Sequence, residues 1–418
     1  MSYTDDLNCF LDDYFGSVPT ETIDLDAEQV EPALEFSNKA THRQRQVYLQ
    51  ALAKIGFAEW LKKRQPSLFS QELTLLQPVD SNIIDAVCNV EVNNFKLCLI
   101  PTISFSDDEI TVPRAVIDLP EFAHHFYVIL AIDEELDVIG IKGFIRYDEL
   151  SNYRAQLQPQ IDWTYQLPLS NFSQDPNELL LYLQHLPPDA IVLPEVTSRK
   201  NTLISIHQEL LHILPQIGNR SLWKALNWRQ GEAVLATPEI LKWLDTEDTA
   251  HKSTHLSDLL QILTQQVIDA RDWLNNQFNW QVRPLASAFR GEIRELTEII
   301  TKISQQNNLE IPRTASYACQ EILNTPVQIH IITWSLNSDE WALLLILTSS
   351  NYLLASEYNL RVSDQQAILA SETLERNSQD QCVYTLVVGN YQDIFIATIT
   401  SAQGETHVLP PFQFSLPS

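Results

Sequence analysis

The sequence predicts an α+β multi-domain protein with an N-terminal helix-on-antiparallel-sheet layer, a central helical section and a C-terminal immunoglobulin-like β-sandwich. Three observations predict this fold class. The apolar spacing changes along the chain from strand alternation to a helical period of about 3.6 residues and then to short strand-like runs. A Pro-, Gln- and Ser-rich stretch separates the first two patterns. With 418 residues, 44% of them hydrophobic, the chain can bury two or three cores.

Shifts in charge and composition divide the chain into five parts. The predicted parts are an acidic arm at 1–36, an α+β domain at 37–150, a linker-like segment at 151–200, a helical region at 201–325 and a β-sandwich domain at 326–418. We find no internal repeat among them. The fold class therefore rests on three separate structured regions joined by polar chain.

The arm is acidic throughout, and a basic stretch follows it. Ten Asp and Glu residues precede the first base, Lys39, and the stretch from Lys39 to Arg64 holds seven Lys and Arg residues, both ends included. The arm is open to three interpretations: a solvated tail, a segment folded back on the basic stretch, or a docking segment for a basic partner. Aromatic residues interleaved among the acids favour docking, because a solubility tail has no need of them. The candidate partner-binding residues of the arm are Phe10, Asp12, Asp13, Tyr14 and Phe15.

The first domain is predicted as one helix on one sheet. Apolar residues share one face of a helix over Gln44–Arg64, and Pro66 stops that helix. The plainest packing lays this helix on a sheet, an α+β layer. The predicted strands are Val87–Val92, Phe95–Ile100, Glu109–Val112, Phe126–Ile132 and Val138–Tyr147.

The five cysteines are odd in number and widely spread, which disfavours a disulfide framework and favours a reducing compartment. Cys88 and Cys98 flank a predicted hairpin turn at Asn93–Asn94. If Val92 faces Phe95, this register places the two sulfurs on opposite faces of the sheet. The sequence therefore predicts two free thiols.

The pattern in the middle of the chain predicts a linker followed by helices. Residues 151–200 predict a linker holding one short helix, Asn177–Leu186. Helical spacing is expected over about Leu203–Leu323. Within that range, apolar residues from Leu256 to Leu274 and again from Phe289 to Ile303 predict two long helices. Joined at Pro284, these helices should pack as a hairpin.

Trp273 and Trp280 lie seven residues apart and so share one helix face. Two interpretations stay open: packing at the end of a core helix, or an aromatic patch that faces a partner. Trp273 and Trp280 are therefore candidate partner-binding residues.

The last segment alternates short apolar runs with turn residues. About seven strands in some ninety residues are typical of a sandwich of immunoglobulin type. Only one cysteine, Cys382, lies in this segment, so the disulfide of antibody domains is absent. The predicted strands are Gln328–Trp334, Trp341–Thr348, Tyr352–Leu354, Tyr358–Val362, Cys382–Val388, Asp393–Ile399 and His407–Leu409.

Motifs for catalysis, metals and nucleotides are not found. His251 and His255 have metal-ligand spacing, but the first falls in a predicted loop. His124 and His125 precede a strand and point to opposite sides, which predicts one surface and one packed histidine. No Gly-Lys dipeptide exists for a P-loop. We therefore assign no catalytic residues, no metal ligands and no cofactors.

Charge and hydropathy restrict the partners. A formal net charge of −27 disfavours direct binding to nucleic acid. No apolar run reaches the roughly 18 residues that a membrane span needs, and the N-terminus lacks the pattern of a signal peptide. We expect a cytoplasmic protein with no membrane contact.

Three strings resemble a cyanobacterial family known as domain of unknown function number eighteen twenty-two. They are the helix Gln46–Ala53, the strands Val90–Val92, Leu97–Pro101, Tyr127–Ile129 and Ile139–Phe144, and the aromatic element Trp273, Leu274, Phe278, Trp280 and Gln281, whose last two residues come two places early. The resemblance covers most of the chain and implies no catalytic residues. It implies that members accompany sigma-70-type transcription factors and caspase-like CHAT proteases.

These observations favour a non-enzymatic cytoplasmic regulatory or adaptor protein that binds a basic protein partner. The resemblance suggests sequestration of a sigma-70-type factor in a system with a CHAT-type protease. Electrostatic steering agrees, because sigma factors are basic and this chain is acidic. Two alternatives remain open: an enzyme without a recognisable motif, such as a hydrolase, and a structural subunit of a defence or stress assembly.

Overall fold

The computed structural model of the chain describes residues 21–40, 43–74, 76, 84–217, 221–245, 252–270, 283–288, 294–307, 310–322, 325–349, 356–375 and 382–414. These residues fall into two compact units. The first unit runs to Arg199 and takes in Gln216–Leu241, and the second unit holds Lys200–Pro215 and the chain from Lys242 onward. Among the described residues, no helix combines the length and the apolar character that crossing a membrane requires.

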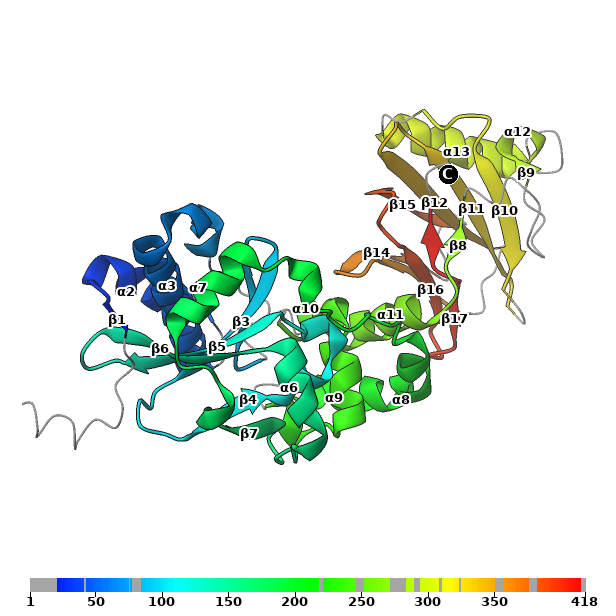
Figure 1. The fold of residues 1–418 in the computed structure, drawn as a ribbon. Helices are drawn as coiled ribbons and strands as arrows, with labels where there is room; N and C mark the ends of the chain where they lie inside the picture. Colours follow the sequence, from blue (N-terminus) through cyan, green and yellow to red (C-terminus); the bar gives the residue numbers. More distant parts are fainter. Residues whose placement is uncertain are drawn as a thin grey trace, which may run out of the picture. The chain divides into compact units, whose positions relative to one another are not determined.

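A five-stranded sheet in the order β1-β6-β5-β3-β2 forms the centre of the first unit (Figure 1). All its neighbouring strands are antiparallel except β3 and β5, which run parallel with Leu97 opposite Phe126. The predicted antiparallel sheet is therefore wrong at this pair, because the chain crosses over between β3 and β5 instead of turning back in a hairpin. The strands are β1 (Thr22–Asp24), β2 (Val87–Val92), β3 (Phe95–Thr102), β5 (Phe126–Asp133) and β6 (Val138–Arg146).

Helix α3 packs on this sheet and occupies Gln44–Arg64, the range that the sequence predicts. The sequence predicted that one face of this helix is apolar. In the structure, α3 is buried almost all round between α2 and the sheet. Even Gln50 and Lys54 are buried, and Gln50 Nε2 donates to Ile84 O at 2.7 Å. The helices of this unit are α2 (Ala27–Asn38), α3, α5 (Arg114–Asp118), α6 (Tyr147–Tyr153), α7 (Pro176–His185) and α9 (Trp228–Leu235).

The described part of the acidic arm folds back on the basic helix. Strand β1 pairs with β6, and α2 packs on α3 behind a capping box formed by Asp26 and Gln29. Glu21 accepts a hydrogen bond from Trp60 Nε1 at 2.8 Å and pairs with Arg64 at 3.1 Å. Of the three interpretations of the arm, folding back therefore holds for its described residues, 21–36.

The segment that composition predicts as a linker contributes to the fold of the first unit. Strand β7 (Thr164–Pro168) pairs antiparallel with β4 (Glu109–Pro113) as a separate ribbon. The expected short helix is confirmed as α7, and its Leu179 and Leu183 are fully buried in the same core as the sheet. Polar composition misled here because few residues of 151–200 outside β7 and α7 are buried.

The second unit is mostly strands, in agreement with the predicted α+β class. One sheet has the order β15-β12-β11-β10-β9, another the order β14-β13-β16-β17, and β8 pairs in parallel with β18. The strands are β8 (Ile268–Asp269), β9 (Arg283–Pro284), β10 (Ser316–Glu321), β11 (Val327–Ser335), β12 (Glu340–Ser349), β13 (Tyr358–Ser363), β14 (Ile368–Leu374), β15 (Cys382–Asn390), β16 (Ile396–Ser401), β17 (Thr406–Val408) and β18 (Phe412–Gln413).

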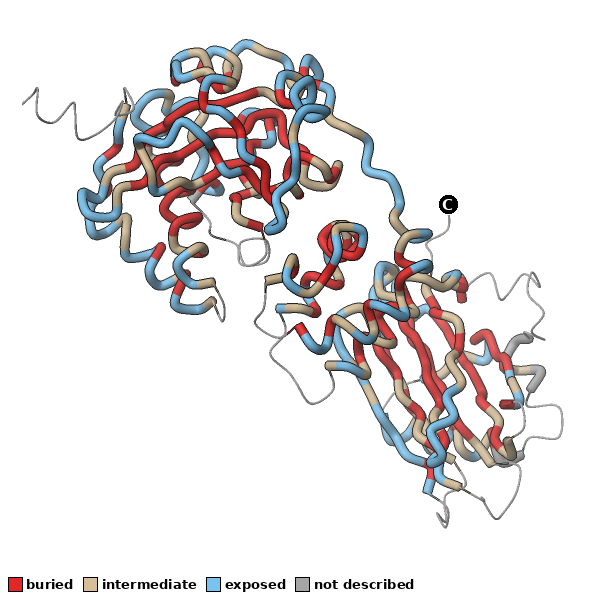
Figure 2. The backbone as a smooth tube through the Cα atoms, turned by 90° about the horizontal axis from the view of Figure 1, so that it is seen from below, coloured by how far each residue is buried: buried red, intermediate tan, exposed pale blue. Residues whose placement is uncertain are grey.

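The two larger sheets share a core. Leu343 of β12, Leu360 of β13 and Ile399 of β16 belong to one buried cluster, and Figure 2 shows the strands as largely buried chain. The opposite face of the β15-β12-β11-β10-β9 sheet packs against Leu296, Ile300 and other apolar residues of α13. The predicted strand at 352–354 lies outside the described residues, and β14 was not predicted.

The expected helical hairpin around Pro284 is wrong. Helix α11 ends at Thr264, β8 follows, and Pro284 lies in the edge strand β9, where a missing N–H costs no ladder bond. Strand β10 also falls in the range predicted as helix. The helices are α8 (Lys200–Ile217) and α10 (Pro238–Asp245), which both cross the unit boundary, and α11 (Lys252–Thr264), α12 (Leu285–Ala288) and α13 (Arg294–Asn307).

Candidate functional site

An open groove of about 1140 Å³ lies over the exposed face of the β4–β7 ribbon in the first unit. Strand alternation places Glu109, Thr111 and Gln166 on this face, while Ile110 and Leu167 are buried on the other. Thr111 and Gln166 face each other across the ribbon and exchange side-chain hydrogen bonds of 2.9 and 3.1 Å. The floor of the groove is therefore an ordered polar surface.

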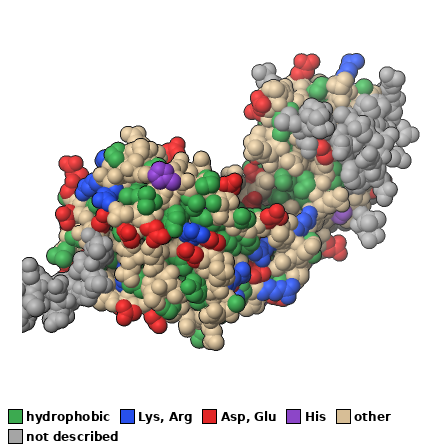
Figure 3. All heavy atoms as spheres, viewed as in Figure 1, with side chains coloured by type: hydrophobic (Ala, Val, Ile, Leu, Met, Phe, Trp, Pro, Cys, Tyr) green, Lys and Arg blue, Asp and Glu red, His purple; other side chains and the backbone are tan. Residues whose placement is uncertain are grey.

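The groove is strongly acidic. Its lining includes the four carboxylates of Asp107, Asp108, Glu109 and Asp162 against the single ammonium of Lys224, a net charge of −3. Figure 3 shows acidic and basic side chains interspersed over the face that it draws. The lining itself has a local excess of three negative charges.

Apolar groups accompany the charge. Ile161 is 92% exposed, and Trp223 is half-buried beneath the Arg43 guanidinium, which lies 5.8 Å from the ring centroid. Aromatic rings and exposed aliphatic side chains suit the long stems of lysine and arginine. The groove lining includes neither histidine nor cysteine.

A buried lysine binds the backbone of the acidic turn formed by Asp107 and Asp108. Lys142 Nζ donates to Ser104 O at 3.1 Å and to Asp107 O at 2.6 Å. Burial lowers the pKa of Lys142, and the nearby Asp107 and Asp108 carboxylates oppose that shift. The ammonium is bound by backbone carbonyls, while the side chains of Asp107 and Asp108 are exposed. The turn is thus preorganised with its carboxylates in solvent.

The opposite wall is fixed by tryptophan packing. Trp163 has a positive φ of 61° and packs on Gly231 of α9, where a Cβ atom would lie 2.0 Å from the indole. Trp163 also meets Trp228 edge-to-face at 5.3 Å, and the Arg114 guanidinium lies 3.9 Å from the Trp228 ring centroid. This cluster anchors residues 160–162, which carry Ile161 and Asp162 to the groove.

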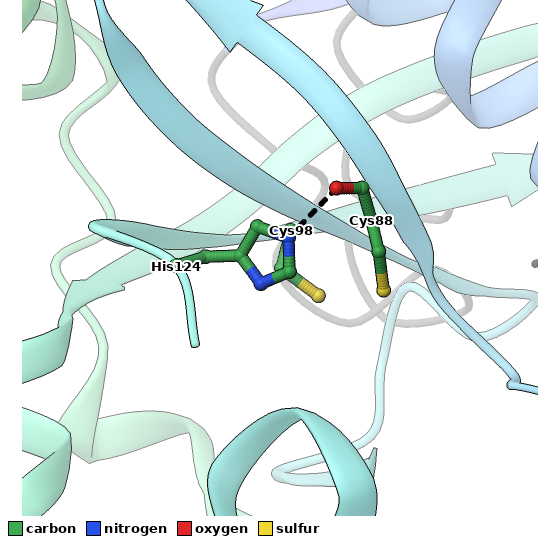
Figure 4. A group of neighbouring side chains, drawn as sticks. All are labelled: Cys88, Cys98 and His124. Atoms are coloured by element: carbon green, nitrogen blue, oxygen red, sulfur yellow. Dashed lines mark hydrogen bonds between the residues drawn. The ribbon is translucent and has the colours of Figure 1, made fainter. Parts of the chain in front are cut away.

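A second candidate site is the group Cys88, Cys98 and His124, shown in Figure 4. Their ligand atoms all lie within 4.8 Å of one another. Cys88 comes from β2, Cys98 from β3, and His124 from the segment just before β5. The expectation that the two sulfurs lie on opposite faces is therefore wrong, although both thiols are free as predicted.

A β-bulge brings the sulfurs together. The predicted register holds from Val92 to Val90, but Val87 then pairs with Leu99, so Cys88 and Asn89 both oppose Cys98. Asn89 accepts a hydrogen bond from Lys54 of α3 at 3.3 Å. The extra residue lets Cys88 reach the Cys98 face of the sheet instead.

His124 is held by two hydrogen bonds. Its Nε2 lies 2.8 Å from Cys88 O, and its backbone N–H donates to the Tyr127 hydroxyl at 3.3 Å. That hydroxyl donates to Val116 O at 2.7 Å. Within the described residues, His124 Nδ1 is buried and has no hydrogen-bond partner. A buried imidazole nitrogen that has no hydrogen-bond partner among the described residues is unusual.

Burial shifts the pKa values of His124, Cys98 and the neighbouring Tyr127. It lowers the pKa of His124, and the hydrogen bond to the Cys88 carbonyl opposes that shift. It raises the pKa of Cys98 well above the ordinary value, with a further contribution from a hydrogen bond to Cys88. It also raises the pKa of the Tyr127 hydroxyl. Burial thus favours the uncharged forms of His124, Cys98 and Tyr127.

The paired histidines differ from expectation. Both are buried, His124 at 3% and His125 at 8% exposure, so the prediction of one surface histidine is wrong. His125 Nδ1 accepts the Lys96 N–H at 2.8 Å and packs edge-on against Phe95. A parallel neighbour strand on one side and an antiparallel hairpin on the other enclose this segment, which a local pattern does not reveal.

The predicted partner-binding residues lie outside the described part of the chain. This holds for Phe10, Asp12, Asp13, Tyr14, Phe15, Trp273 and Trp280. Of the two histidines with metal-ligand spacing, His251 also lies outside it, and His255 is buried with Nε2 3.2 Å from Asp364 O. The run Asp107-Asp108-Glu109 before a strand was the one signal of the groove, and nothing in the sequence pointed to Trp223.

Comparison with known proteins places the chain in a family. No curated protein matches it. A family model described as "Protein of unknown function (DUF1822)" matches residues 23–407, which include both candidate sites and most of both units. The chain therefore belongs to the DUF1822 family.

Proposed function

We propose that this chain is a non-enzymatic, cytoplasmic regulatory or adaptor protein that holds a basic segment of a partner protein in the acidic groove over β4 and β7. The observation that carries the proposal is the net charge of −3 on an ordered, exposed lining. Opposite charge steers a partner into such a groove and fixes its register. The formal charge of −27 on the whole chain adds long-range attraction.

The lining favours an extended basic peptide over a small molecule. The groove is open. Its floor is a polar strand surface, and its lining includes one exposed isoleucine and one half-buried tryptophan. Small-molecule sites are usually enclosed, whereas this groove is open. Lysine and arginine side chains can place their charges on Asp107, Asp108 and Asp162 while their stems cover Ile161 and Trp223.

We propose a sigma-70-type transcription factor as the first partner to test, in a system that includes a CHAT-type protease. Support comes from charge: a protein that binds nucleic acid presents a basic surface, and an acidic surface can occupy it. Sequestration follows if the groove and the promoter compete for the same basic segment. The chain itself then needs no contact with nucleic acid or membrane.

Reversing the charge of the groove is expected to weaken this association about tenfold. In Asp107→Lys/Asp108→Lys, two attractive charges become repulsive on an exposed surface, where each pair contributes up to about 1 kcal/mol. The measurement is the affinity of the purified full chain for a purified sigma-70-type factor, by fluorescence anisotropy. Raising the salt from about 0.05 M to 0.5 M should weaken wild-type binding more than binding by the variant, because screening acts on the same charges.

The matched control changes the net charge equally but elsewhere. Glu372→Lys/Glu375→Lys alters two exposed acids of the second unit and should leave binding within about twofold. Deleting residues 1–20 tests the acidic arm; a cut at residue 36 would also remove β1 and most of α2. A pull-down from native extract with mass spectrometry identifies partners of other classes. If the wild-type chain captures no protein at low salt, the proposed function is wrong.

A further inference from the structure

We propose that Cys88, Cys98 and His124 form a binding site for one Zn²⁺ ion in the first unit. Two sulfurs and one imidazole nitrogen converge within 4.8 Å from two neighbouring strands and the segment before a third. The inference is independent of the acidic groove, whose lining shares none of these residues.

The donor set suits zinc. Thiolate and imidazole are the ligands that Zn²⁺ takes in proteins, at about 2.3 Å for sulfur and about 2.0 Å for nitrogen. Tetrahedral coordination at these lengths puts neighbouring ligand atoms about 3.7 Å apart. The group must therefore contract by about 1 Å at most from its 4.8 Å limit, which side-chain rotation can supply.

The histidine has the orientation of a metal ligand. Nε2 lies 2.8 Å from Cys88 O, which fixes its hydrogen there and leaves the lone pair on Nδ1. Metal-binding imidazoles usually donate their second N–H to a carbonyl or carboxylate in this manner. Nδ1 is buried and without a hydrogen-bond partner among the described residues, so a metal would satisfy an atom that is otherwise left bare.

Zinc explains the cluster better than a disulfide does. A Cys88–Cys98 disulfide would use both sulfurs and still leave His124 Nδ1 unsatisfied in the interior. Metal binding uses all three groups at once. Each thiol loses its proton to solvent as its thiolate bonds to the metal, so two protons leave for each Zn²⁺ bound and the site becomes neutral overall.

Three protein ligands leave a fourth position, which a water molecule would fill. Cys98 is fully buried and Cys88 is half-buried, so access is from the Cys88 side. The bulge in β2 is what makes the site, since a regular strand would turn Cys88 to the α3 side. Zinc would thereby join β2, β3 and the segment just before β5.

The test measures zinc bound to the full chain. The protein is reduced, stripped with a chelator, supplied with Zn²⁺ and washed, and its metal is quantified by mass spectrometry. We expect about one zinc per chain, falling to near zero in Cys88→Ser/Cys98→Ser and in His124→Gln. The matched control is Cys319→Ser/Cys382→Ser, which replaces two cysteines outside the cluster and should leave zinc binding unchanged.

Two readouts keep the test valid if a variant folds poorly. Co²⁺ in place of Zn²⁺ should give the sulfur-to-metal charge-transfer absorption of wild type and of the control, and this band should be lost from Cys98→Ala. Zinc at about 100 times its dissociation constant should raise the melting temperature of the wild-type first unit by about 5–10 °C, and that of His124→Gln by none.

Three results would overturn the proposal. The reduced wild-type chain retains no zinc; the Cys88→Ser/Cys98→Ser variant retains as much zinc as wild type; or the chain isolated under thiol-blocking conditions carries a Cys88–Cys98 disulfide and binds no metal after reduction. Tighter binding of Cu⁺ than of Zn²⁺ through the same three residues would assign the cluster to copper and also reject zinc.

Discussion

Replacing Asp258 with alanine is expected to lower the free energy of unfolding of the second unit by about 3–5 kcal/mol. Asp258 of α11 is 2% exposed and pairs with Arg361 of β13 through two hydrogen bonds of 2.8 and 2.9 Å. Ser363 and Thr398 donate to the same carboxylate at 2.7 and 3.2 Å. Alanine would leave the Arg361 charge largely buried, with a side chain 15% exposed and no counter-ion in this group.

The measurement is urea unfolding with pulsed hydrogen exchange of α11 and β13 peptides, which reports on the second unit alone. Asp339→Ala removes an exposed acid of the same unit and should change stability by less than about 0.5 kcal/mol. The double variant Asp258→Leu/Arg361→Met removes both charges and should recover part of the loss. Equal losses for the Asp258 and Asp339 variants would mean that this ion pair does not fix α11 to the sheet.

Of the two residues in this ion pair, the sequence predicted the strand that carries Arg361 but not the burial of Asp258. The strand that carries Arg361 was predicted at nearly its observed range, Tyr358–Ser363, because apolar alternation depends only on the pleat. The partner, Asp258, lies more than a hundred residues earlier on a predicted helix face. Its burial depends on how α11 packs on β13 and β16, which no local period encodes.

Element type was predictable where one physical cause dominated. Helix α3 was placed residue for residue because its apolar run ends at a proline, and the turn at Asn93–Asn94 because both residues tolerate a positive φ, here 49° and 67°. The helical hairpin around Pro284 failed because edge strands β8 and β9 are only two residues long. Pairing partners from distant parts of the chain define such strands.

The candidate sites were harder to predict than the fold. The acidic groove needs the β4–β7 ribbon, and β7 lies in a segment whose composition indicates a linker. The thiol–imidazole cluster needs a one-residue bulge between Val87 and Val90. A regular register gives the opposite answer for Cys88, because a shift of one residue turns a side chain to the other face. Neither feature leaves a mark on apolar periodicity.

Acidification is expected to destabilise the second unit through His330 of β11. The imidazole is 4% exposed, with Nδ1 3.0 Å from the Tyr317 hydroxyl and Nε2 3.0 Å from the Thr348 hydroxyl. Burial lowers the pKa of His330 from 6.5 to about 4. Both ring nitrogens already have partners, so the shift reflects the cost of a charge in the sheet rather than a missing hydrogen bond.

The sign follows from proton binding. Above pH 6.5 both the folded and the unfolded chain hold His330 neutral, so it contributes no pH dependence. Between pH 6.5 and about 4 the unfolded chain binds a proton that the folded chain does not, and stability falls as the pH falls. The loss attributable to His330 reaches about 2 kcal/mol at pH 5 and about 3 kcal/mol near pH 4, where it levels off.

Comparing wild type with His330→Gln at two pH values isolates this contribution in so acidic a chain. The substitution itself costs stability at pH 7, because it disturbs the hydrogen bonds to Tyr317 and Thr348. The decisive quantity is the change in unfolding free energy between pH 7 and pH 5, measured by urea unfolding with exchange of β11 peptides. That change should be smaller in His330→Gln by about 2 kcal/mol, since glutamine does not titrate. An identical pH dependence in the two proteins would show that His330 is protonated at no cost, and that its buried site between β10, β11 and β12 admits a charge as readily as water does.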